Sequence, residues 1–339
     1  MRINWINYRF IEVDGYGRFG INFIKALHRS GVHVTPIEKS QYEWPSYLRQ
    51  LAGIHTNRLT IALMPSYELL PSMGRVWNYT MYEGTGLDKR WIPALNDYAE
   101  RLIVPHQFLV EVFADHGAKV PIHVVPGGTD PQEFPVSLTS PYETGRPYTF
   151  LALGDRGSRK GWDLVWQAFW NAFGDNRDVR LLIKMRPGFN RVLDLAGSDD
   201  RIIIWREDSA SMNEVYDHAD CFVFPSRGEG WGMPPREFAM TGKPVICTDW
   251  SGLSGDLDKW AIPIPITGLV RSALDGGGLW AAPDVDAITE AMRWCYDNRE
   301  AARQKGLAAA QWLRANQTWE HAAQKLISLI REIGHVVDD

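Results

Sequence analysis

The sequence predicts an α/β protein built from two Rossmann-like domains, and three observations carry this prediction. Short apolar strands alternate with amphipathic helical segments along the chain, which is the pattern of parallel sheets covered by helices. The length of 339 residues suggests two domains of ordinary size. A proline- and glycine-rich stretch from Pro126 to Pro141 is typical of an interdomain linker. We therefore expect an N-terminal domain over residues 1–140 and a C-terminal domain over residues 147–317.

The N-terminal half begins with a β–α–β pattern. Arg2 to Tyr8 alternates apolar residues as a strand does, a helix with one apolar side follows, and Gly31 ends it. The second strand is expected from Val32 to Ile37. Further strands of this sheet are expected at Leu59–Met64, Val76–Tyr82, Arg101–Val104 and Ile122–Val125.

The C-terminal half continues the alternation. Strands are expected at Tyr148–Leu153, Val179–Met185, Arg201–Trp205, Cys221–Phe224 and Pro244–Thr248, and helices at Asn213–His218, Arg303–Ala315 and Thr318–Ile333. The spacing of Trp319, Ala322, Leu326 and Ile330 predicts one buried stripe on the last helix. Asp284 and Asp286 precede a helix, so we expect capping there rather than a metal site.

Composition and charge exclude several classes of protein. The chain is 45% hydrophobic and 23% charged, with a formal net charge of −5, so no global field attracts nucleic acid or an anionic membrane. Its cysteines, Cys221, Cys247 and Cys295, show neither metal-ligand nor disulfide spacing. The sequence shows neither a signal peptide nor a membrane-spanning run. These features predict a cytoplasmic protein.

The most informative stretch runs from Phe224 to Leu253. Glu229 lies in a glycine-rich loop after an apolar strand, and Glu237 follows eight positions later on a predicted helix. Ligands of open α/β sheets bind beyond the carboxyl ends of the strands, and loop amides near a helix N-terminus favour anions. Carboxylates suit pairs of hydroxyls. The stretch therefore predicts a ligand with many hydroxyls and a phosphate, the alternative being two solvated glutamates around an ordinary helix start.

This stretch resembles the E-x7-E motif of retaining glycosyltransferases of the GT-B fold, most closely family four. The agreement includes the strand ending Phe-Pro-Ser, the EGWGMP loop and the REFAMTGKPVI segment. The resemblance implies two domains facing each other across a cleft, with the C-terminal helix, 318–339, crossing back to the N-terminal domain. It implies that Glu229 contacts the donor sugar near the reacting carbon and that Glu237 holds the donor ribose. Further donor contacts are implied for Gly230, Trp231, Gly232 and Met233.

A second motif, from Gly154 to Gly161, contains three cations where a strand gives way to a helix. Cations and helix amides at such a place bind diphosphates. In the resembling family, a Gly-Arg followed by Lys-Gly supplies an arginine and a lysine to the donor diphosphate. Lys160 matches that lysine, whereas Arg156 and Arg159 are both candidates for the arginine. The alternative is a basic surface turn.

The loop after the first strand contains Gly15, Gly17 and Gly20 in a G-x-G-x-x-G pattern. With Glu38 after the second strand, this pattern is also the fingerprint of a dinucleotide-binding protein, so an NAD-dependent oxidoreductase is the rival hypothesis. In the resembling families a glycine-rich loop here faces the donor phosphates and the acceptor. We therefore expect Gly17 at the donor, and Tyr16 and Arg18 at the acceptor or a phosphate.

Glu83 is a further candidate for a catalytic role. Family-four relatives place a histidine in the N-terminal domain, and Glu83 follows a predicted strand in that domain. A capping or solvated carboxylate is an equally good interpretation. His106 is expected to be structural.

The predicted function is transfer of a hexose from a UDP- or GDP-linked sugar to an acceptor hydroxyl, with retention of configuration and without metal or cofactor. Lys160 and its neighbouring arginines would stabilise the leaving diphosphate, and Glu229 would position the sugar. A glycan, a small molecule or a modified DNA base are the candidate acceptors. Nucleic acid is a minority option suggested by four basic residues near the first loop, Arg9, Arg18, Lys25 and Arg29. A sugar-nucleotide enzyme or binding protein of the same fold that transfers nothing is a further alternative.

Overall fold

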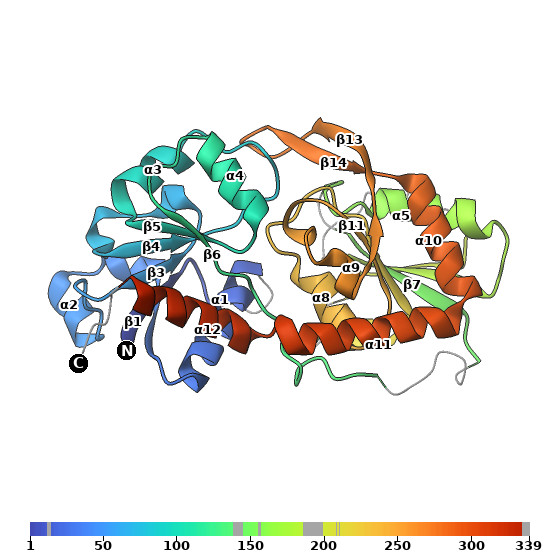
Figure 1. The fold of residues 1–339 in the computed structure, drawn as a ribbon, viewed down its shortest axis with the longest axis horizontal. Helices are drawn as coiled ribbons and strands as arrows, with labels where there is room; N and C mark the ends of the chain where they lie inside the picture. The colour runs from blue at the N-terminus through green and yellow to red at the C-terminus, as the bar shows by residue number, and fades with distance from the viewer. Residues whose placement is uncertain are drawn as a thin grey trace. The chain divides into compact units, whose positions relative to one another are not determined.

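The computed structural model describes residues 1–11, 15–137, 145–154, 157–185, 199–207, 209 and 211–333. The chain forms two compact units (Figure 1). The N-terminal unit consists of Met1–Gly128, Ser272–Gly278 and Gln317–Asp339, and the C-terminal unit of Thr129–Arg271 and Leu279–Asn316. The chain first passes between the units inside the proline- and glycine-rich segment, part of which lies outside the described residues.

The N-terminal unit is built on a six-stranded parallel sheet with the order β2-β1-β3-β4-β5-β6. Its strands are β1 (Arg2–Asn7), β2 (His33–Glu38), β3 (Thr60–Leu63), β4 (Val76–Tyr79), β5 (Arg101–Val104) and β6 (Ile122–Val124). Its helices are α1 (Gly15–Arg29), α2 (Ser46–Leu51), α3 (Trp91–Tyr98) and α4 (Gln107–Asp115), with short 3₁₀ turns η1 (Lys39–Glu43), η2 (Ser66–Glu68) and η3 (Pro71–Met73). His106 is structural, as predicted, because its Nδ1 accepts a hydrogen bond from the Phe108 amide at the start of α4.

The last helix, α12 (Trp319–Glu332), belongs to the N-terminal unit and packs on α1. The ring of Trp319 meets those of Phe19 and Phe23 at centroid distances of 5.0 and 5.9 Å. The predicted stripe of Trp319, Ala322, Leu326 and Ile330 is buried. The final helix therefore returns the chain to the N-terminal sheet, and its apolar stripe is what holds it there.

The C-terminal unit contains a second six-stranded parallel sheet, in the order β12-β11-β10-β7-β8-β9. Its strands are β7 (Tyr148–Gly154), β8 (Val179–Met185), β9 (Ile202–Trp205), β10 (Cys221–Phe224), β11 (Val245–Thr248) and β12 (Ile262–Ile264). The chain builds outward from β7 to β9 and then continues with β10 on the other side of β7. The strand order thus reverses between β7 and β10, which is where open α/β sheets bind their ligands.

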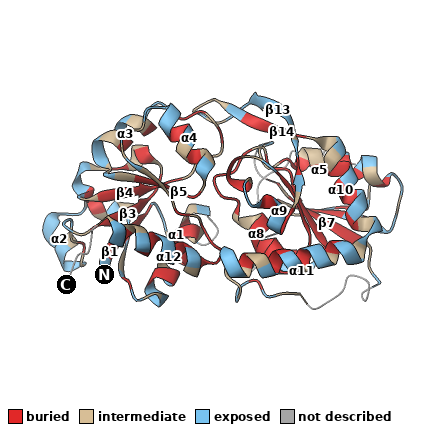
Figure 2. Cartoon of the chain, in the orientation of Figure 1, coloured by how far each residue is buried: buried red, intermediate tan, exposed pale blue. Residues whose placement is uncertain are grey.

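Helices cover both faces of this sheet and complete two apolar cores, visible as buried residues in Figure 2. The helices are α5 (Trp162–Phe173), α7 (Met212–Asp217), α8 (Met233–Met240), α9 (Leu257–Trp260), α10 (Val285–Asp297) and α11 (Arg299–Asn316), with the 3₁₀ turn η4 (Ser251–Leu253). One core includes residues of α5 and α10, and the other includes residues of α8, α9 and α11. The predicted α/β class, with two parallel sheets covered by helices, is confirmed.

An antiparallel hairpin of β13 (Ile266–Arg271) and β14 (Leu279–Pro283) was not expected from the sequence. Its tip, Ser272–Gly278, belongs to the N-terminal unit and lies against Gly86. A Cβ at Gly86 would come within 2.6 Å of the Gly278 nitrogen, so only glycine permits this close packing of the two backbones.

The predicted capping role of Asp284 is confirmed, and it generates a prediction about stability. Its Oδ1 accepts hydrogen bonds from the amides of Asp286 and Ala287 at 2.9 and 3.1 Å at the start of α10. Asp284→Ala should lower the free energy of unfolding by about 1 kcal/mol, measured by urea denaturation. Glu290→Ala, on the exposed side of α10, is the control and should change it by less than about 0.5 kcal/mol. Equal losses in both variants would exclude capping as the cause.

Candidate functional site

The candidate site lies in the C-terminal unit, where loops follow β7 and β10. Glu229 occupies the loop between β10 and α8, and Lys160 the loop between β7 and α5. These strands are neighbours in the sheet and flank the point where the strand order reverses. The sheet topology therefore brings the two predicted motifs together.

Glu229 is the centre of a buried charge cluster. Its side chain is 8% exposed, and its Oε1 accepts hydrogen bonds from Lys160 Nζ at 2.6 Å and from Arg159 Nη1 at 2.9 Å. Ser226 Oγ donates to the same oxygen at 2.8 Å. Burial alone would raise the pKa of Glu229, but the charges of Lys160 and Arg159 and these hydrogen bonds outweigh it and lower that pKa. The carboxylate is therefore ionised at neutral pH.

The backbone around this cluster joins the loops after β7 and β10. Arg159 also donates to the Gly228 carbonyl at 2.7 Å, and the Arg227 amide donates to the Arg159 carbonyl at 2.7 Å. Gly161 has a φ of +71°, and a Cβ there would lie 2.1 Å from the Pro225 carbonyl oxygen. The two motifs thus form one structural unit, held by backbone contacts as well as by charge.

A third segment, η4, supports the Glu229 loop from the other side. Ser251 Oγ accepts from the Glu229 amide at 3.0 Å, and the Gly252 amide donates to the Glu229 carbonyl at 2.9 Å. Ser251 has a φ of +57°, a left-handed conformation that is costly for a residue with a side chain. Such strain persists only where surrounding contacts impose it, and here those contacts hold the Glu229 backbone.

Arg236, on α8, contacts both the Glu229 loop and the η4 segment and holds them together. Its guanidinium carbon lies 3.8 Å from the ring centroid of Trp231 and 4.6 Å from that of Trp260. It donates to the carbonyls of Trp231, Gly232 and Gly252, the last two at 3.2 Å. Burial lowers the pKa of Arg236 to about 9, which leaves it charged at neutral pH. This cation was missed in the sequence, because a charged residue on a short helix is usually solvated.

Glu237 lies on α8, is 4% exposed, and accepts a hydrogen bond from Tyr216 Oη at 3.2 Å. Gly230, Trp231 and Gly232 are buried, and Met233 is half-buried. The Trp231 indole N–H and the Thr248 hydroxyl are buried without a hydrogen-bond partner in the described part of the chain. Unsatisfied polar groups beside a glutamate loop favour a site for a polar ligand.

The other predicted residues lie in the N-terminal unit. Tyr16 Oη donates to the Met81 carbonyl at 2.8 Å, and burial, followed by the charge of Glu83, raises the pKa of Tyr16. Glu83 and Arg18 are half-buried. The sheet therefore brings Tyr16 and the Glu83 segment together, which sequence spacing alone did not show. Arg156 lies outside the described residues.

Two glycines of the predicted first loop, Gly17 and Gly20, lie in the first turns of α1 and pack closely within the N-terminal unit. A Cβ at Gly17 would lie 2.2 Å from the Ile11 carbonyl oxygen, and one at Gly20 would lie 2.4 Å from Asn7 Nδ2. The approach of α1 to the segment around β1 thus explains Gly17 and Gly20, whereas a Cβ at Gly15 would meet no described atom within 4 Å.

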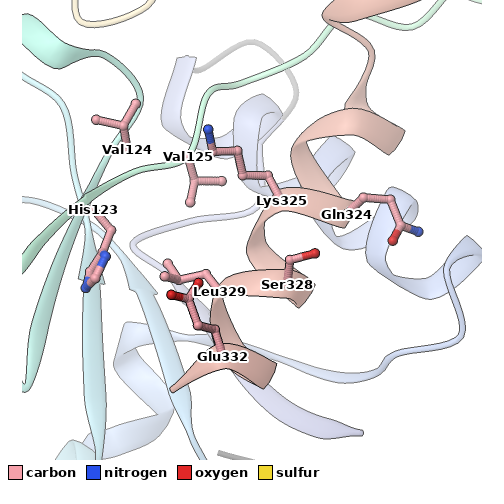
Figure 3. A pocket seen from close by; sticks show the side chains of 8 residues that line it. All are labelled: His123, Val124, Val125, Gln324, Lys325, Ser328, Leu329 and Glu332. Atoms are coloured by element: carbon pink, nitrogen blue, oxygen red, sulfur yellow. The ribbon is translucent and has the colours of Figure 1, made fainter. Parts of the chain in front are cut away.

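Among the described residues, two other kinds of feature are absent. No group of three or more His, Cys, Asp and Glu side chains there is arranged to hold a metal ion. No helix there has the length and apolar character needed to cross a membrane. A hollow of about 460 Å³ lies in the N-terminal unit between β6 and α12 (Figure 3). Its lining consists of His123, Val124, Val125, Gln324, Lys325, Ser328, Leu329 and Glu332, none of them a predicted site residue.

Comparison with known families and curated proteins gives consistent matches. Residues 104–326 match the family described as Family 4 Glycosyltransferase in conflict systems. The chain is 34% identical over 117 residues to the lipopolysaccharide core biosynthesis mannosyltransferase LpsB of Rhizobium meliloti, covering 33% of this chain and 29% of that protein. It is 26% identical over 191 residues to the O-antigen chain mannosyltransferase B of Escherichia coli, covering 56% and 38%. The matches thus span about a third of each curated relative's length.

Solved structures match nearly the whole chain. The sucrose-phosphate synthase of Thermosynechococcus elongatus has a TM-score of 0.70 at 15% identity, with 98% of each chain covered. Anabaena Alr3699/HepE, solved with UDP-glucose, has a TM-score of 0.70 at 13% identity, covering 98% of this chain and all of the other. At such identities these likenesses show the fold alone, and they confirm the predicted GT-B fold.

The charge cluster at Glu229 predicts a loss of stability in acid. Because the pKa of Glu229 is lowered in the folded protein, its stabilisation is present above the ordinary value of 4.5 and is lost as pH falls through the folded pKa. Glu229→Gln should lower the free energy of unfolding by about 1–3 kcal/mol at neutral pH, with a smaller gap in acid. Chemical denaturation across pH measures this, with the exposed Glu290→Gln as control. A gap independent of pH would contradict the assignment.

The Arg236 contacts predict that lysine cannot replace this arginine. A single ammonium lacks the planar fork that stacks on two indoles and donates to three carbonyls. Arg236→Lys should lower the free energy of unfolding by about 1–3 kcal/mol in urea denaturation. Arg177→Lys is the matched control, since that side chain is 69% exposed and its ion pair should contribute almost nothing. Similar stability of the two variants would remove the structural role of Arg236.

Proposed function

Because the chain belongs to the family-four glycosyltransferases of conflict systems, we propose that it transfers a hexose from a nucleoside-diphosphate sugar to an acceptor hydroxyl. The proposal includes retention of configuration at the anomeric carbon. The observation that carries it is the buried, ionised Glu229 held by Lys160 and Arg159 at the strand-order reversal of the C-terminal sheet. The curated mannosyltransferase relatives and the UDP-glucose complex of a structural neighbour support the donor class.

The contacts of Glu229 suggest how the donor is received. The three side-chain contacts of its carboxylate all fall on Oε1, so Oε2 receives none of them. Oε2 is then the acceptor offered to the sugar hydroxyls. Lys160 and Arg159 have side chains 15% and 19% exposed and lie beside the amides that begin α5, so a diphosphate can share these cations with Glu229.

Charge development decides the roles of these groups. When the bond between the anomeric carbon and the diphosphate oxygen breaks, the sugar becomes positive and the diphosphate gains negative charge. Lys160 and Arg159 stabilise that growing negative charge, while the ionised Glu229 orients the sugar and lies near its positive centre. The acceptor hydroxyl attacks on the leaving-group face and passes its proton to the departing diphosphate. Fixed cations supply the leaving-group stabilisation, so the proposal includes neither a metal ion nor an organic cofactor.

In this proposal, residues of the N-terminal unit bind the acceptor. Tyr16 and Glu83 lie close together there, with Glu83 half-buried. We propose Glu83 as a catalytic carboxylate and Tyr16 and Arg18 as acceptor contacts. A glycan, a small molecule and a hydroxylated DNA base are the acceptor classes to screen, and only the last should lose binding steeply with salt.

The test combines binding with turnover. Thermal shift with UDP-, GDP- and ADP-sugars and with NAD should show stabilisation by a sugar nucleotide, because a ligand of the folded state raises the melting temperature. A coupled assay that monitors release of the nucleoside diphosphate measures turnover. Lys160→Ala should lower kcat about 10²–10³-fold in this assay. Glu229→Gln should also lower kcat. NMR of the wild-type product should show the same anomeric configuration as the donor.

Lys259→Ala is the control for these measurements, because Lys259 is an exposed cation outside the described cluster. It should keep wild-type turnover. Stabilisation by NAD alone would overturn the proposal in favour of an oxidoreductase, and an inverted product would overturn the retaining mechanism.

A further inference from the structure

Arg206 directly follows β9, the edge strand of the C-terminal sheet. The strands of this sheet are parallel, so Arg206 lies at the same end of the sheet as the Lys160 and Glu229 loops. Lys184 Nζ donates to the Glu207 carbonyl at 2.7 Å, which holds the segment after β9 against β8. The position of Arg206 is therefore set by the sheet and by a neighbouring contact.

The guanidinium of Arg206 has two buried nitrogens, Nε and Nη2, with no hydrogen-bond partner in the part of the chain that the structure describes. These two nitrogens share one edge of the planar group, so their N–H bonds form a parallel fork. A buried charged donor without a partner is costly in free energy and requires an explanation. The residue as a whole is only partly buried, so other atoms of its side chain reach the surface, and binding of a ligand edge by the fork requires the side chain to turn.

Other arginines of the same unit show what such a fork ordinarily holds. Arg146 donates two hydrogen bonds to the Asp220 carboxylate, from Nη1 at 2.8 Å and Nη2 at 2.6 Å. Arg227 donates two to the Asp163 carboxylate, from Nη1 at 2.9 Å and Nη2 at 2.8 Å. Arg201 holds Asp199 in the same bidentate way. Arg206 has the same Nε and Nη2 fork as Arg201 but without a carboxylate, and two adjacent acceptors from a ligand would complete it.

The expected distance between Arg206 and the cations proposed to bind the diphosphate matches the reach of a nucleoside. Arg206 follows the strand two places from β7, and strands in a sheet are spaced by about 4.8 Å, so their ends lie roughly 10 Å apart. A ribose and base attached to a diphosphate at Lys160 bridge such a span. The fork of Arg206 is thus placed for the far end of a nucleoside.

We propose that Arg206 reads the base of the donor and that this base is guanine, an inference that rests on the proposed function. Guanine presents two adjacent acceptors, O6 and N7, on an edge away from its glycosidic bond, and arginine binds this pair through two hydrogen bonds. Adenine presents one acceptor and one donor there. The two carbonyls of uracil are separated by an N–H donor, and the adjacent acceptors of cytosine lie beside its glycosidic bond.

Calorimetric titration of the full chain with GDP, UDP, ADP, CDP and pyrophosphate tests this. GDP should bind about tenfold or more tighter than the other nucleotides. Arg206→Lys keeps the charge but loses the fork, and should weaken GDP about tenfold while leaving UDP and pyrophosphate unchanged. Arg177→Lys, an exposed cation, should leave every affinity unchanged.

The outcomes separate this inference from the proposed function. Tightest binding of UDP, ADP or CDP by the wild type overturns guanine recognition whatever the variants do. Equal weakening of pyrophosphate and all nucleotides in Arg206→Lys would make Arg206 a phosphate contact and overturn its role as base reader. Absence of binding by every nucleoside diphosphate would instead overturn the proposed donor site itself.

Discussion

The carboxylate of Glu229 is the group on which the C-terminal site depends. With its side chain only 8% exposed, an ionised carboxylate is tolerated only if it is paired, and here the partners are Lys160 and Arg159 from the loop after β7. Pairing therefore draws the loops after β7 and β10 together at the reversal of strand order. The cations that pair with Glu229 are also those that the proposed mechanism assigns to the donor diphosphate, so one cluster both joins the two loops and forms the proposed donor site.

Much of this arrangement could be predicted from the sequence, because its signals are local. β10 is a continuous apolar run buried on both faces, and β8 is apolar at five of its seven positions, so both were predicted with the bounds that the structure has. Asp284 was predicted to cap a helix and not to bind a metal, because it directly precedes a helical segment. The Glu229 loop was evident from its glycines and its place after a strand, and the family resemblance assigned it and Lys160 to one donor. That β7 and β10 are neighbours was learned from the structure.

The remainder depends on contacts between residues far apart in the chain. Arg236 lies between Trp231 and Trp260, and nothing in the spacing of these residues indicates that a cation would be buried between two indoles. The hairpin of β13 and β14 was missed because β13 is almost wholly exposed and its connection contains three consecutive glycines. Such features follow from packing, for which the sequence has no periodic signal.

Arg236 and Arg206 show why burial of a cation does not by itself indicate function. Arg236 is almost fully buried, but its donors reach three carbonyls and its faces stack on aromatic rings, so the surrounding protein satisfies it. Arg206 is less buried, but two of its nitrogens find no acceptor among the described residues. The first pattern is that of a structural clamp. The second leaves a pair of donors open among the described residues, and we propose that the two adjacent acceptors of guanine on a nucleoside-diphosphate donor complete it.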